Sequence, residues 1–277
     1  MKVTILTPSY NQAGFLEDAL LSVREQDYRF VEHLVIDGAS CDRSQDLLSQ
    51  YAGERMAWFS EPDEGQVDAL LKGLHLTNGE VVAWLNTDDI YLHKGVISKV
   101  VELFQTNPQV DWITGTGWLL NERGEQIRET PYQPQRINFE VLRYRNFVLQ
   151  PATFLRRKIL DDLPLDKSLH YTFDWDLWIR AVRQFRVLTV ADQWAGYRWW
   201  SGSKTASRAA ARVREQAEVT RRYAGDNSWQ YRTLRFYFHL FSWIEALPAA
   251  SRQPLRSFLH RSSSALSRLV NYRIAVA

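Results

Sequence analysis

Two adjacent carboxylates, Asp88 and Asp89, carry the strongest chemical signal in this sequence. They follow the apolar run Val81–Leu85, which predicts a buried strand. Neighbouring carboxylates beside such a strand repel each other and lose solvation unless a cation or a donor compensates them. Oxygen ligands without a nearby cysteine or histidine cluster favour Mg²⁺ or Mn²⁺ over zinc. The pair therefore indicates a divalent-cation site, and a solvated turn that caps a helix is the alternative.

A second acidic pair, Asp174 and Asp176, flanks Trp175 at the start of an apolar helical segment. A carboxylate beside large aromatic rings loses hydration, which raises its pKa and makes it a better proton acceptor. The alternative is placement of acids in a first helical turn, where the helix dipole favours them. Nearby aromatic residues could stack on a sugar or base, but most are expected in the core. They are Trp175, Trp178, Trp194, Tyr197, Trp199 and Trp200.

Further acids follow other predicted strands. Asp37 ends an apolar strand, where it can accept hydrogen bonds from a ribose or base, or close a turn with Gly38. The segment Glu61–Gly65 holds three acids in four residues, a pattern also typical of the acidic first turn of a helix.

The elements that must position these residues alternate along the first hundred residues. Strands alternating with helices predict a mainly parallel sheet covered on both faces, with ligands at the carboxyl ends of the strands. Neither G-x-G-x-x-G nor G-x-x-x-x-G-K-[ST] occurs near the first strand, which disfavours a dinucleotide or P-loop site. The expected strands are Val3–Leu6, His33–Ile36 and Val81–Leu85, and the expected helices Ala13–Gln26, Asp42–Tyr51, Gly65–Leu76 and Gly95–Phe104.

The pattern is looser beyond about residue 110. Strands are expected at Asp111–Gly117, Asn146–Leu155 and Phe185–Val190, a hairpin turn at Asn121–Glu125, and a helix at Phe173–Phe185. From Ser203 the chain predicts helices, namely one to about Tyr223, then Trp229–Leu247 and Arg252–Val270.

Charge divides the chain in two. Its 277 residues carry a formal net charge of +2. Residues 1–203 contain 21 Lys/Arg and 28 Asp/Glu, a balance of −7, whereas residues 204–277 contain 13 and 4, a balance of +9. An acidic body argues against a nucleic-acid partner, whose binding face would be basic. The single cysteine, Cys41, fits a reducing compartment. With no signal peptide or bilayer-length apolar run, we expect a cytoplasmic protein.

The ordered series of motifs resembles the family 2 glycosyltransferases of the GT-A fold, over about residues 1–205. The matching segments are Thr7–Asn11, Asp37–Asp42, Ser60–Gly65, Asn86–Asp89, Gln150–Phe154, Asp174–Arg180 and Tyr197-Arg198. The resemblance implies an α/β fold with a Rossmann-like, mainly parallel sheet flanked by helices. It also implies transfer of a sugar from a nucleoside diphosphate with inversion at the anomeric carbon.

The resemblance further assigns roles. Asp174 matches the general base, and Asp89 matches the ligand of a divalent Mg²⁺ or Mn²⁺ ion. The donor, a UDP-, GDP- or dTDP-sugar, would contact Pro8, Tyr10, Asp37, Asp63, Lys72 and Asp88. The acceptor, a glycan or a lipid-linked carrier, would involve Gln150, Thr153, Trp175, Asp176 and Trp200.

Three positions depart from the family pattern. Phe173 stands where a glutamate often precedes the base, and Leu71 where an asparagine often precedes the lysine. Trp200 replaces a histidine that can approach the metal or diphosphate, which implies a weaker site for both. A nucleotidyltransferase and an inactive nucleotide-sugar binding protein are the alternatives, and the missing Gly-rich basic loop counts against the first.

We expect a catalytic domain at residues 1–205, with a nucleotide half (1–109) and an acceptor half (110–205), followed by a basic helical extension at 206–277. The extension could contact anionic lipid at the inner face of the membrane. The alternative is a solvated packing module or a homo-oligomer contact. Its first helix carries Arg208, Arg212, Arg214, Arg221 and Arg222.

Overall fold

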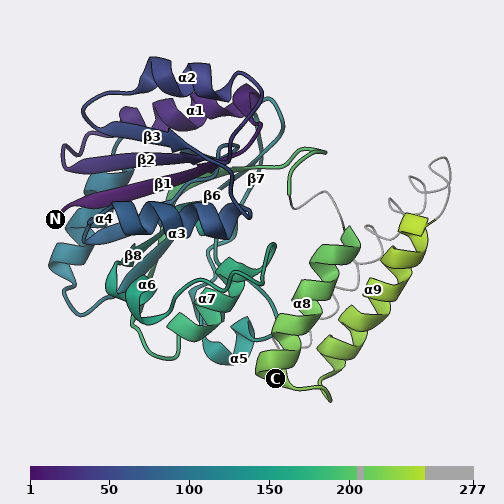
Figure 1. Cartoon of the computed structure of the whole chain (residues 1–277). Coiled ribbons are helices and arrows are strands. Elements are labelled where there is room, and N and C mark those ends of the chain that lie inside the picture. The colour runs from purple at the N-terminus through teal and green to yellow at the C-terminus, as the bar shows by residue number, and fades with distance from the viewer. Residues whose placement is uncertain (205–208, 247–277) are drawn as a thin grey trace. The chain divides into compact units, whose positions relative to one another are not determined.

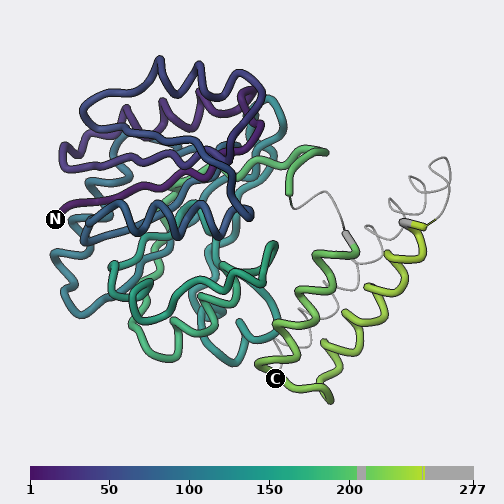
Figure 2. The backbone as a smooth tube through the Cα atoms, in the orientation of Figure 1, coloured from purple at the N-terminus to yellow at the C-terminus, as the bar shows by residue number. Residues whose placement is uncertain are grey.

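The computed structural model of this protein describes residues 1–204 and 209–246, whose backbone Figure 2 traces. The chain separates into two compact units, Met1–Ser207 and the residues from Arg208 onwards. The first unit begins with the predicted alternation of strands and helices. These elements are β1 (Val3–Ser9), α1 (Ala13–Arg24), β2 (Val31–Asp37), α2 (Ser44–Tyr51), β3 (Met56–Ser60), α3 (Gln66–Leu76), β4 (Val81–Trp84), β5 (Ile90–Tyr91) and α4 (Val96–Thr106).

Strands β1 to β4 form a parallel block, in which β1 lies between β2 and β4 and β3 pairs with β2. The register aligns the carboxyl ends of three of them, because Ser9 pairs with Asp37 and Asp37 pairs with Ser60. Strand β4 ends at Trp84, which pairs with Leu6. The loops after these strands therefore open at one edge of the sheet, as the sequence predicts.

The rest of the first unit extends the same sheet. In the described part of the chain the sheet has nine strands, in the order β3-β2-β1-β4-β8-β6-β9-β5, with β7 paired to β6. Strand β8 is antiparallel to both β4 and β6, whereas β9 runs parallel to β6. These elements are β6 (Trp112–Leu120), β7 (Gln126–Glu129), η1 (Pro134–Arg136), α5 (Phe139–Leu142), η2 (Gln150–Ala152), β8 (Thr153–Arg156), α6 (Lys158–Asp162), α7 (Phe173–Ala181) and β9 (Val187–Arg198).

Two predicted strands of this half differ from the structure. In place of a strand at Asn146–Leu155, a short 3₁₀ turn leads into β8, because Pro151 has no N–H to give to a sheet ladder. The strand predicted at Phe185–Val190 begins at Val187 and continues to Arg198. Its polar middle still pairs with β6, where Gln193 lies opposite Thr116. The predicted hairpin turn at Asn121–Glu125 is confirmed between β6 and β7.

Helices cover both faces of the sheet, and Figure 1 shows α1 and α2 on one side and α3 on the other. Val35 of β2 packs with Leu16 of α1 and Leu48 of α2. On the opposite face α3 approaches closely at Gly73, where a Cβ atom would lie 2.6 Å from Ile36. Gly73 therefore sets how near α3 lies to the sheet.

Helix α7 is fixed to the α3 face of the sheet by a stack of three tryptophans. Trp178 lies between Trp84 of β4 and Trp112 of β6, with ring centroids 5.7 Å and 5.4 Å away and planes inclined by 6° and 8°. All three side chains are fully buried. Because stacked aromatic rings bury large areas in a specific geometry, this contact sets the position of α7.

The described part of the second unit is a helical hairpin, α8 (Ala209–Ala224) and α9 (Trp229–Ala246), which lie side by side (Figure 1). Gly225, at a φ of +82°, ends α8 in the left-handed conformation that glycine adopts readily. Phe241 and Ile244 pack against Ala210 and Val213 in a small core. The helix expected at 252–270 lies outside the described residues. Among the described helices, none combines the length and apolar character that crossing a bilayer requires.

Candidate active site

The carboxyl end of β2 presents a buried acid, Asp37. Its carboxylate accepts hydrogen bonds from the backbone N–H of Ser40 at 2.9 Å and from the Ser60 hydroxyl at 2.6 Å. Ser40 in turn accepts the backbone N–H of Asn11 at 2.8 Å, which ties the loops after β1 and β2 together. The turn-closing role is therefore present in the structure, and contact with a donor base stays a prediction for Asp37.

The loop after β3 lies over the loop after β2. The carboxylate of Asp63 approaches Gly38 so closely that a Cβ atom there would lie 2.6 Å from Asp63 Oδ2. Asp63 also accepts the backbone N–H of Gly65 at 2.8 Å, and Gly65 has a φ of +113° that favours glycine. Lys72 of α3 pairs with Glu61 at 2.8 Å and donates to the Pro62 carbonyl at 2.9 Å. Lys72 thus holds this loop on α3.

Pro8 and Tyr10, the remaining residues predicted to contact the donor, lie at the end of β1 and just after it. Pro8 is half-buried and pairs with Ile36 in the sheet register. The Tyr10 side chain is 62% exposed, the highest exposure among the aromatic residues predicted for this site. An exposed ring at the strand-end edge can stack on a planar base.

Asp88 and Asp89 follow β4 at the same edge. Asp89 is 1% exposed and accepts hydrogen bonds from the backbone N–H of Arg198 and from the Asn86 amide, both at 3.0 Å. Asp88 accepts the indole N–H of Trp200 at 3.0 Å. Burial, followed by the charge of Asp88, raises the pKa of Asp89 well above its ordinary value, and burial also raises the pKa of Asp88. This is the pattern expected of a buried carboxylate pair whose charge a cation would neutralise.

The chemistry of this pair fits a hard divalent cation. Among the described residues no group of three or more His, Cys, Asp or Glu side chains could hold a metal ion by itself. Mg²⁺ and Mn²⁺ are commonly held by one or two carboxylates, with the remaining ligands supplied by water and substrate phosphates. Two carboxylates at a strand end therefore suffice for such an ion.

Arg198 at the end of β9 and Trp200 just after it contact this acidic pair, and both side chains also pack on Phe15 of α1. The Arg198 guanidinium and the Trp200 indole both lie 4.8 Å from the Phe15 ring. Arg198 is 3% exposed and pairs with Asp18 at 2.9 Å. We name Phe15, Arg198 and Trp200 the Phe15 clamp, because Arg198 holds Asp89 and Trp200 holds Asp88. Arg198 donates its backbone N–H to Asp89, and a contact made by the main chain cannot be predicted from the types of the side chains.

Asp174 lies in the first turn of α7, and burial raises the pKa of its carboxyl to about 6. It accepts the backbone N–H of Trp175 at 2.7 Å and an amide N–H of Asn146 at 3.4 Å, and the positive charge of Lys204 acts against the rise. Asp176 differs, because it is 2% exposed and pairs with Arg180 at 2.7 Å. Asp174 thus has the raised pKa of a proton acceptor, whereas the Asp176 carboxylate is held in an ion pair with Arg180.

The residues predicted on the acceptor side divide into two groups. Gln150 belongs with the acidic pair, since its side chain contacts Asn86 at 3.2 Å and donates to the Trp84 carbonyl at 2.6 Å. Thr153 is buried against Thr114 at 2.9 Å. Trp175 is also buried, and its indole donates to the Leu142 carbonyl at 2.6 Å. Thr153 and Trp175 therefore support the site from the protein interior.

A chain of hydrogen bonds that the sequence did not predict joins the segment after β9 to Asp89. The Lys204 ammonium donates to the Gln66 side-chain oxygen at 2.7 Å, and the Gln66 amide donates to Asn86 at 2.6 Å. Asn86 then donates to Asp89 at 3.0 Å. Lys204 also lies 5.6 Å from the Phe173 ring, beside Asp174. Amides and lysines are common on any surface, so only the tertiary structure identifies these partners.

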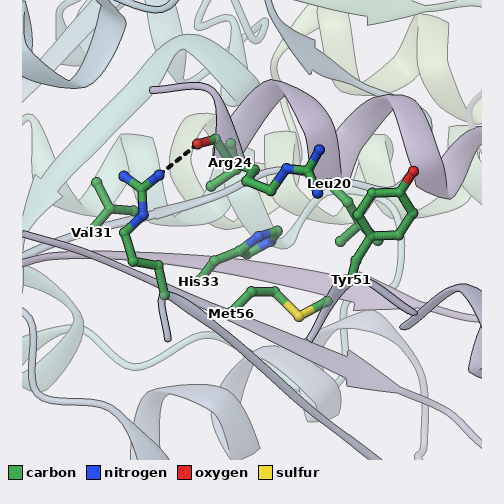
Figure 3. A pocket seen from close by; sticks show the side chains of 8 residues that line it. Leu20, Arg24, Val31, His33, Tyr51 and Met56 are labelled. Carbon is green, nitrogen blue, oxygen red and sulfur yellow. Dashed lines mark hydrogen bonds between the residues drawn. The ribbon is translucent and has the colours of Figure 1, made fainter. Parts of the chain in front are cut away.

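A small cavity lies away from this edge, at the amino ends of β2 and β3 (Figure 3). His33 lines it, and burial lowers the pKa of His33 to about 3, so the ring is neutral beside the Thr7 hydroxyl at 2.9 Å. The cavity volume of about 20 Å³ has room for one water molecule. No residue predicted for the site lines this cavity, whose walls are Leu20, Val23, Arg24, Val31, His33, Tyr51, Arg55 and Met56.

Comparison with known proteins gives a consistent picture. A sequence profile of the family described as Glycosyl transferase family 2 matches residues 4–163. An uncharacterized glycosyltransferase of Rickettsia typhi is 26% identical over 188 residues, which are 65% of this chain and 58% of that protein. The chain therefore spans less than two thirds of that relative's length.

Two solved structures share the fold. S. aureus TarS in complex with UDP-GlcNAc matches with a TM-score of 0.65 and 14% identity, covering 91% of this chain and 83% of that one. The mannosyltransferase PcManGT from Pyrobaculum calidifontis, in complex with GDP-Man and Mn²⁺, matches with a TM-score of 0.61 and 19% identity, covering 98% and 82%. The predicted GT-A-like α/β fold is confirmed by these matches.

Proposed function

The chain belongs to glycosyl transferase family 2, and from this premise we propose that it transfers a sugar from a nucleoside-diphosphate sugar to an acceptor hydroxyl, with inversion at the anomeric carbon. One observation carries the proposal. The buried acids form two chemically different sites, a cation-binding pair at Asp88 and Asp89 and a proton acceptor at Asp174. A single displacement needs both functions and no third carboxylate.

Asp174 acts as the general base. A carboxyl with a pKa of about 6 is ionised at neutral pH and still basic enough to take a proton from a hydroxyl as the hydroxyl attacks. The backbone N–H of Trp175 and the amide of Asn146 orient its two oxygens. The acceptor hydroxyl would therefore meet a carboxylate whose orientation is already fixed by these two hydrogen bonds.

Asp89, with Asp88 beside it, would hold a Mg²⁺ or Mn²⁺ ion. When bound, such an ion neutralises the charge that develops on the departing diphosphate. The backbone N–H of Arg198 and the amide of Asn86 keep the Asp89 oxygens in place, while the Trp200 indole occupies one oxygen of Asp88. The complex of PcManGT with GDP-Man and Mn²⁺ supports the same class of cation here.

The donor nucleotide binds across the ends of β1 to β4. Tyr10 offers an exposed ring to the base. Pro8 and Asp37 at the ends of β1 and β2, and Asp63 in the loop after β3, lie where the base and ribose would bind. Lys72 contributes by holding the loop that carries Asp63. UDP-GlcNAc in the TarS complex and GDP-Man in the PcManGT complex support a nucleoside-diphosphate sugar as the donor.

A nucleotide-binding screen tests this proposal before the acceptor is identified. UDP, GDP and dTDP, each with and without Mn²⁺, are added to the full chain, and the unfolding temperature is measured. We expect one nucleotide to raise this temperature in a Mn²⁺-dependent way in the wild type and much less in Asp89→Asn. Absence of any Mn²⁺-dependent rise in the wild type would exclude the proposed donor site.

Two alternatives are separated by their products. A nucleotidyltransferase would release diphosphate from a nucleoside triphosphate and a sugar phosphate. A non-catalytic binding protein would bind the donor without releasing nucleoside diphosphate in any acceptor pool. We expect release of nucleoside diphosphate from the sugar donor, measured with a pool of aryl glycosides as acceptors.

A further inference from the structure

Helix α9 carries a row of exposed aromatic side chains. Trp229, Phe236 and Trp243 are 46%, 65% and 56% exposed, and they follow one another at intervals of seven residues. Seven residues are close to two full turns of an α-helix, so the three rings lie on one side of α9 and span about 21 Å of its length. We define the aromatic stripe as Trp229, Phe236 and Trp243.

The aromatic stripe lies outside the small core of the second unit. Phe241 and Ile244 of the same helix are buried in that core, where they pack against α8. At about 100° per residue, Phe241 lies about 140° round the helix from Phe236. The stripe is therefore not what holds the two described helices together. Large apolar side chains exposed in a row mark a surface that contacts another molecule.

Positive charge accompanies the aromatic stripe. Arg232 lies between the first two rings of the stripe on the same side of α9, and Arg235 follows about one turn later at its edge. Both side chains are exposed. Arg232 donates to the side-chain oxygen of Asn227 at 3.4 Å, and Arg235 lies over the Tyr231 ring at 5.8 Å. Because both contacts are with uncharged groups, the two positive charges favour an anionic partner.

The charge around α9 is one-sided. The helix itself contains a single acid, Glu245, and residues 247–277 contain five arginines and no acid. The arginines predicted on α8 differ, because Arg221 and Arg222 pair with Glu218 at 2.8 Å and 3.4 Å. Exposed rings and arginines paired with no carboxylate therefore coincide on α9 in the described part of the second unit.

An anionic bilayer surface matches both features. Tryptophan and phenylalanine on one face of a helix enter the boundary between headgroups and acyl chains, and arginines beside them meet the lipid phosphates. A second copy of the chain fits less well, because pairing two such faces would bring the arginines of both copies into one interface. We propose that the aromatic stripe, together with Arg232 and Arg235, binds the surface of an anionic membrane, with α9 lying along that surface.

Co-sedimentation of the full chain with lipid vesicles tests this proposal. Vesicles of phosphatidylcholine alone are compared with vesicles of equimolar phosphatidylcholine and phosphatidylglycerol. The stripe variant replaces all three residues of the aromatic stripe by serine. Its matched control replaces three exposed apolar side chains of the first unit, Phe30→Ser, Leu76→Ser and Ile127→Ser. Circular dichroism checks that helix content is kept in both.

A charge variant keeps the rings and so does not depend on how the stripe variant folds. It is Arg232→Gln with Arg235→Gln. Its matched control is Arg24→Gln with Arg29→Gln, which removes two exposed arginines of the first unit. The vesicle assay needs neither donor nor acceptor, so its outcome is separate from that of the proposed transferase activity.

We expect the wild type and both controls to bind the anionic vesicles at least about tenfold more tightly than the neutral ones. Affinity for anionic vesicles should fall about tenfold or more in the stripe variant, because the burial of apolar rings is lost. It should fall about thirtyfold in the charge variant, since each arginine near an anionic surface contributes about 1 kcal/mol. Equal affinity of the wild type for the two kinds of vesicle, or unchanged affinity in both variants, would overturn the proposal.

Light scattering of the lipid-free protein distinguishes a membrane from a second copy of the chain. If the wild type is an oligomer that the stripe variant converts to monomers, and the wild type does not bind vesicles, the stripe is an interface between copies and the proposal is wrong. Vesicle binding that requires both the rings and the arginines supports the membrane, whatever the oligomeric state.

Discussion

The indole of Trp178 stacks on the indole of Trp84, with centroids 5.7 Å apart and planes only 6° apart. Trp178 lies one helical turn beyond Asp174 on α7, and Trp84 is the last residue of the strand that leads to Asp88 and Asp89. The stacking of Trp178 on Trp84 therefore sets the position of the proposed base relative to the proposed cation ligands.

Replacing Trp178 by alanine should lower the free energy of unfolding by about 3–5 kcal/mol, because a fully buried aromatic side chain leaves a cavity. The loss should fall near the lower end, since the buried indole N–H has no hydrogen-bond partner among the described residues that truncation would strand. Urea unfolding measures the change. Trp199→Ala is the control, because that ring is 41% exposed and should cost far less. Equal losses in the two variants would refute the role given to the stack.

The raised pKa of Asp174 predicts the acid side of the rate–pH profile. Below pH 6 the carboxyl is increasingly protonated and cannot accept a proton, so the transfer rate should fall about tenfold per pH unit. The same shift has a consequence for stability. Because the folded-state pKa of about 6 exceeds the ordinary 3.8, protonation favours the folded state, and the ionised carboxylate destabilises it above pH 6.

Asp174→Asn should therefore be more stable than the wild type at pH 7, and the advantage should shrink as the pH falls from 6 towards 3.8. Urea unfolding at several pH values measures this difference. A stability advantage that grows on acidification would have the wrong sign for a raised pKa.

Lys204 provides a second test of the Asp174 environment. Its positive charge lowers the pKa of Asp174, so Lys204→Met should raise that pKa further and move the acid limb of the profile to higher pH. The rate–pH profile of the variant is compared with that of Lys99→Met, a lysine of α4 that pairs with Glu102. A limb that stays in place, or moves to lower pH, would exclude the electrostatic link.

Trp200 stands where the resemblance expects a histidine, and its indole N–H occupies an oxygen of Asp88. Trp200→Phe keeps a ring on Phe15 but removes this donor. Mn²⁺ should then bind about two- to tenfold more tightly in the presence of nucleoside diphosphate, since a net hydrogen bond of about 0.5–1.5 kcal/mol no longer competes with the ion. Calorimetry checks this, with Trp199→Phe as the neighbouring control. Weaker binding in Trp200→Phe would show that the indole assists the cation.

Much of the nucleotide half could be predicted from the sequence. Short β-branched runs such as Val3–Leu6 and Val81–Leu85 are strands because only a sheet buries such runs on both faces. Right-handed crossovers then bring their carboxyl ends to one edge, which is why Asp37 and Asp88 lie at the same edge of the sheet, after strands that flank β1. The local pattern and the topology agree there, so the prediction was accurate.

The acceptor half was less predictable for physical reasons. The polar residues Asp192 and Gln193 interrupt the apolar pattern of β9, yet the strand continues because β6 supplies its hydrogen bonds. Arg198 reaches Asp89 through a backbone N–H across 109 residues, and no residue type encodes such a contact. Trp175, Trp178 and Trp194 are buried as expected, but Trp199 is exposed. The presence of a tryptophan therefore did not by itself predict whether the side chain is buried or exposed.

The central claim is that Asp174 takes the proton of the acceptor hydroxyl. Its most direct test is release of nucleoside diphosphate from the sugar donor, with the aryl glycoside pool, by Asp174→Asn. In Asp174→Asn, release should fall to background while Mn²⁺-dependent nucleotide binding is kept. Asp192→Asn, at an exposed acid, should retain full activity. Wild-type rates in Asp174→Asn would contradict the account.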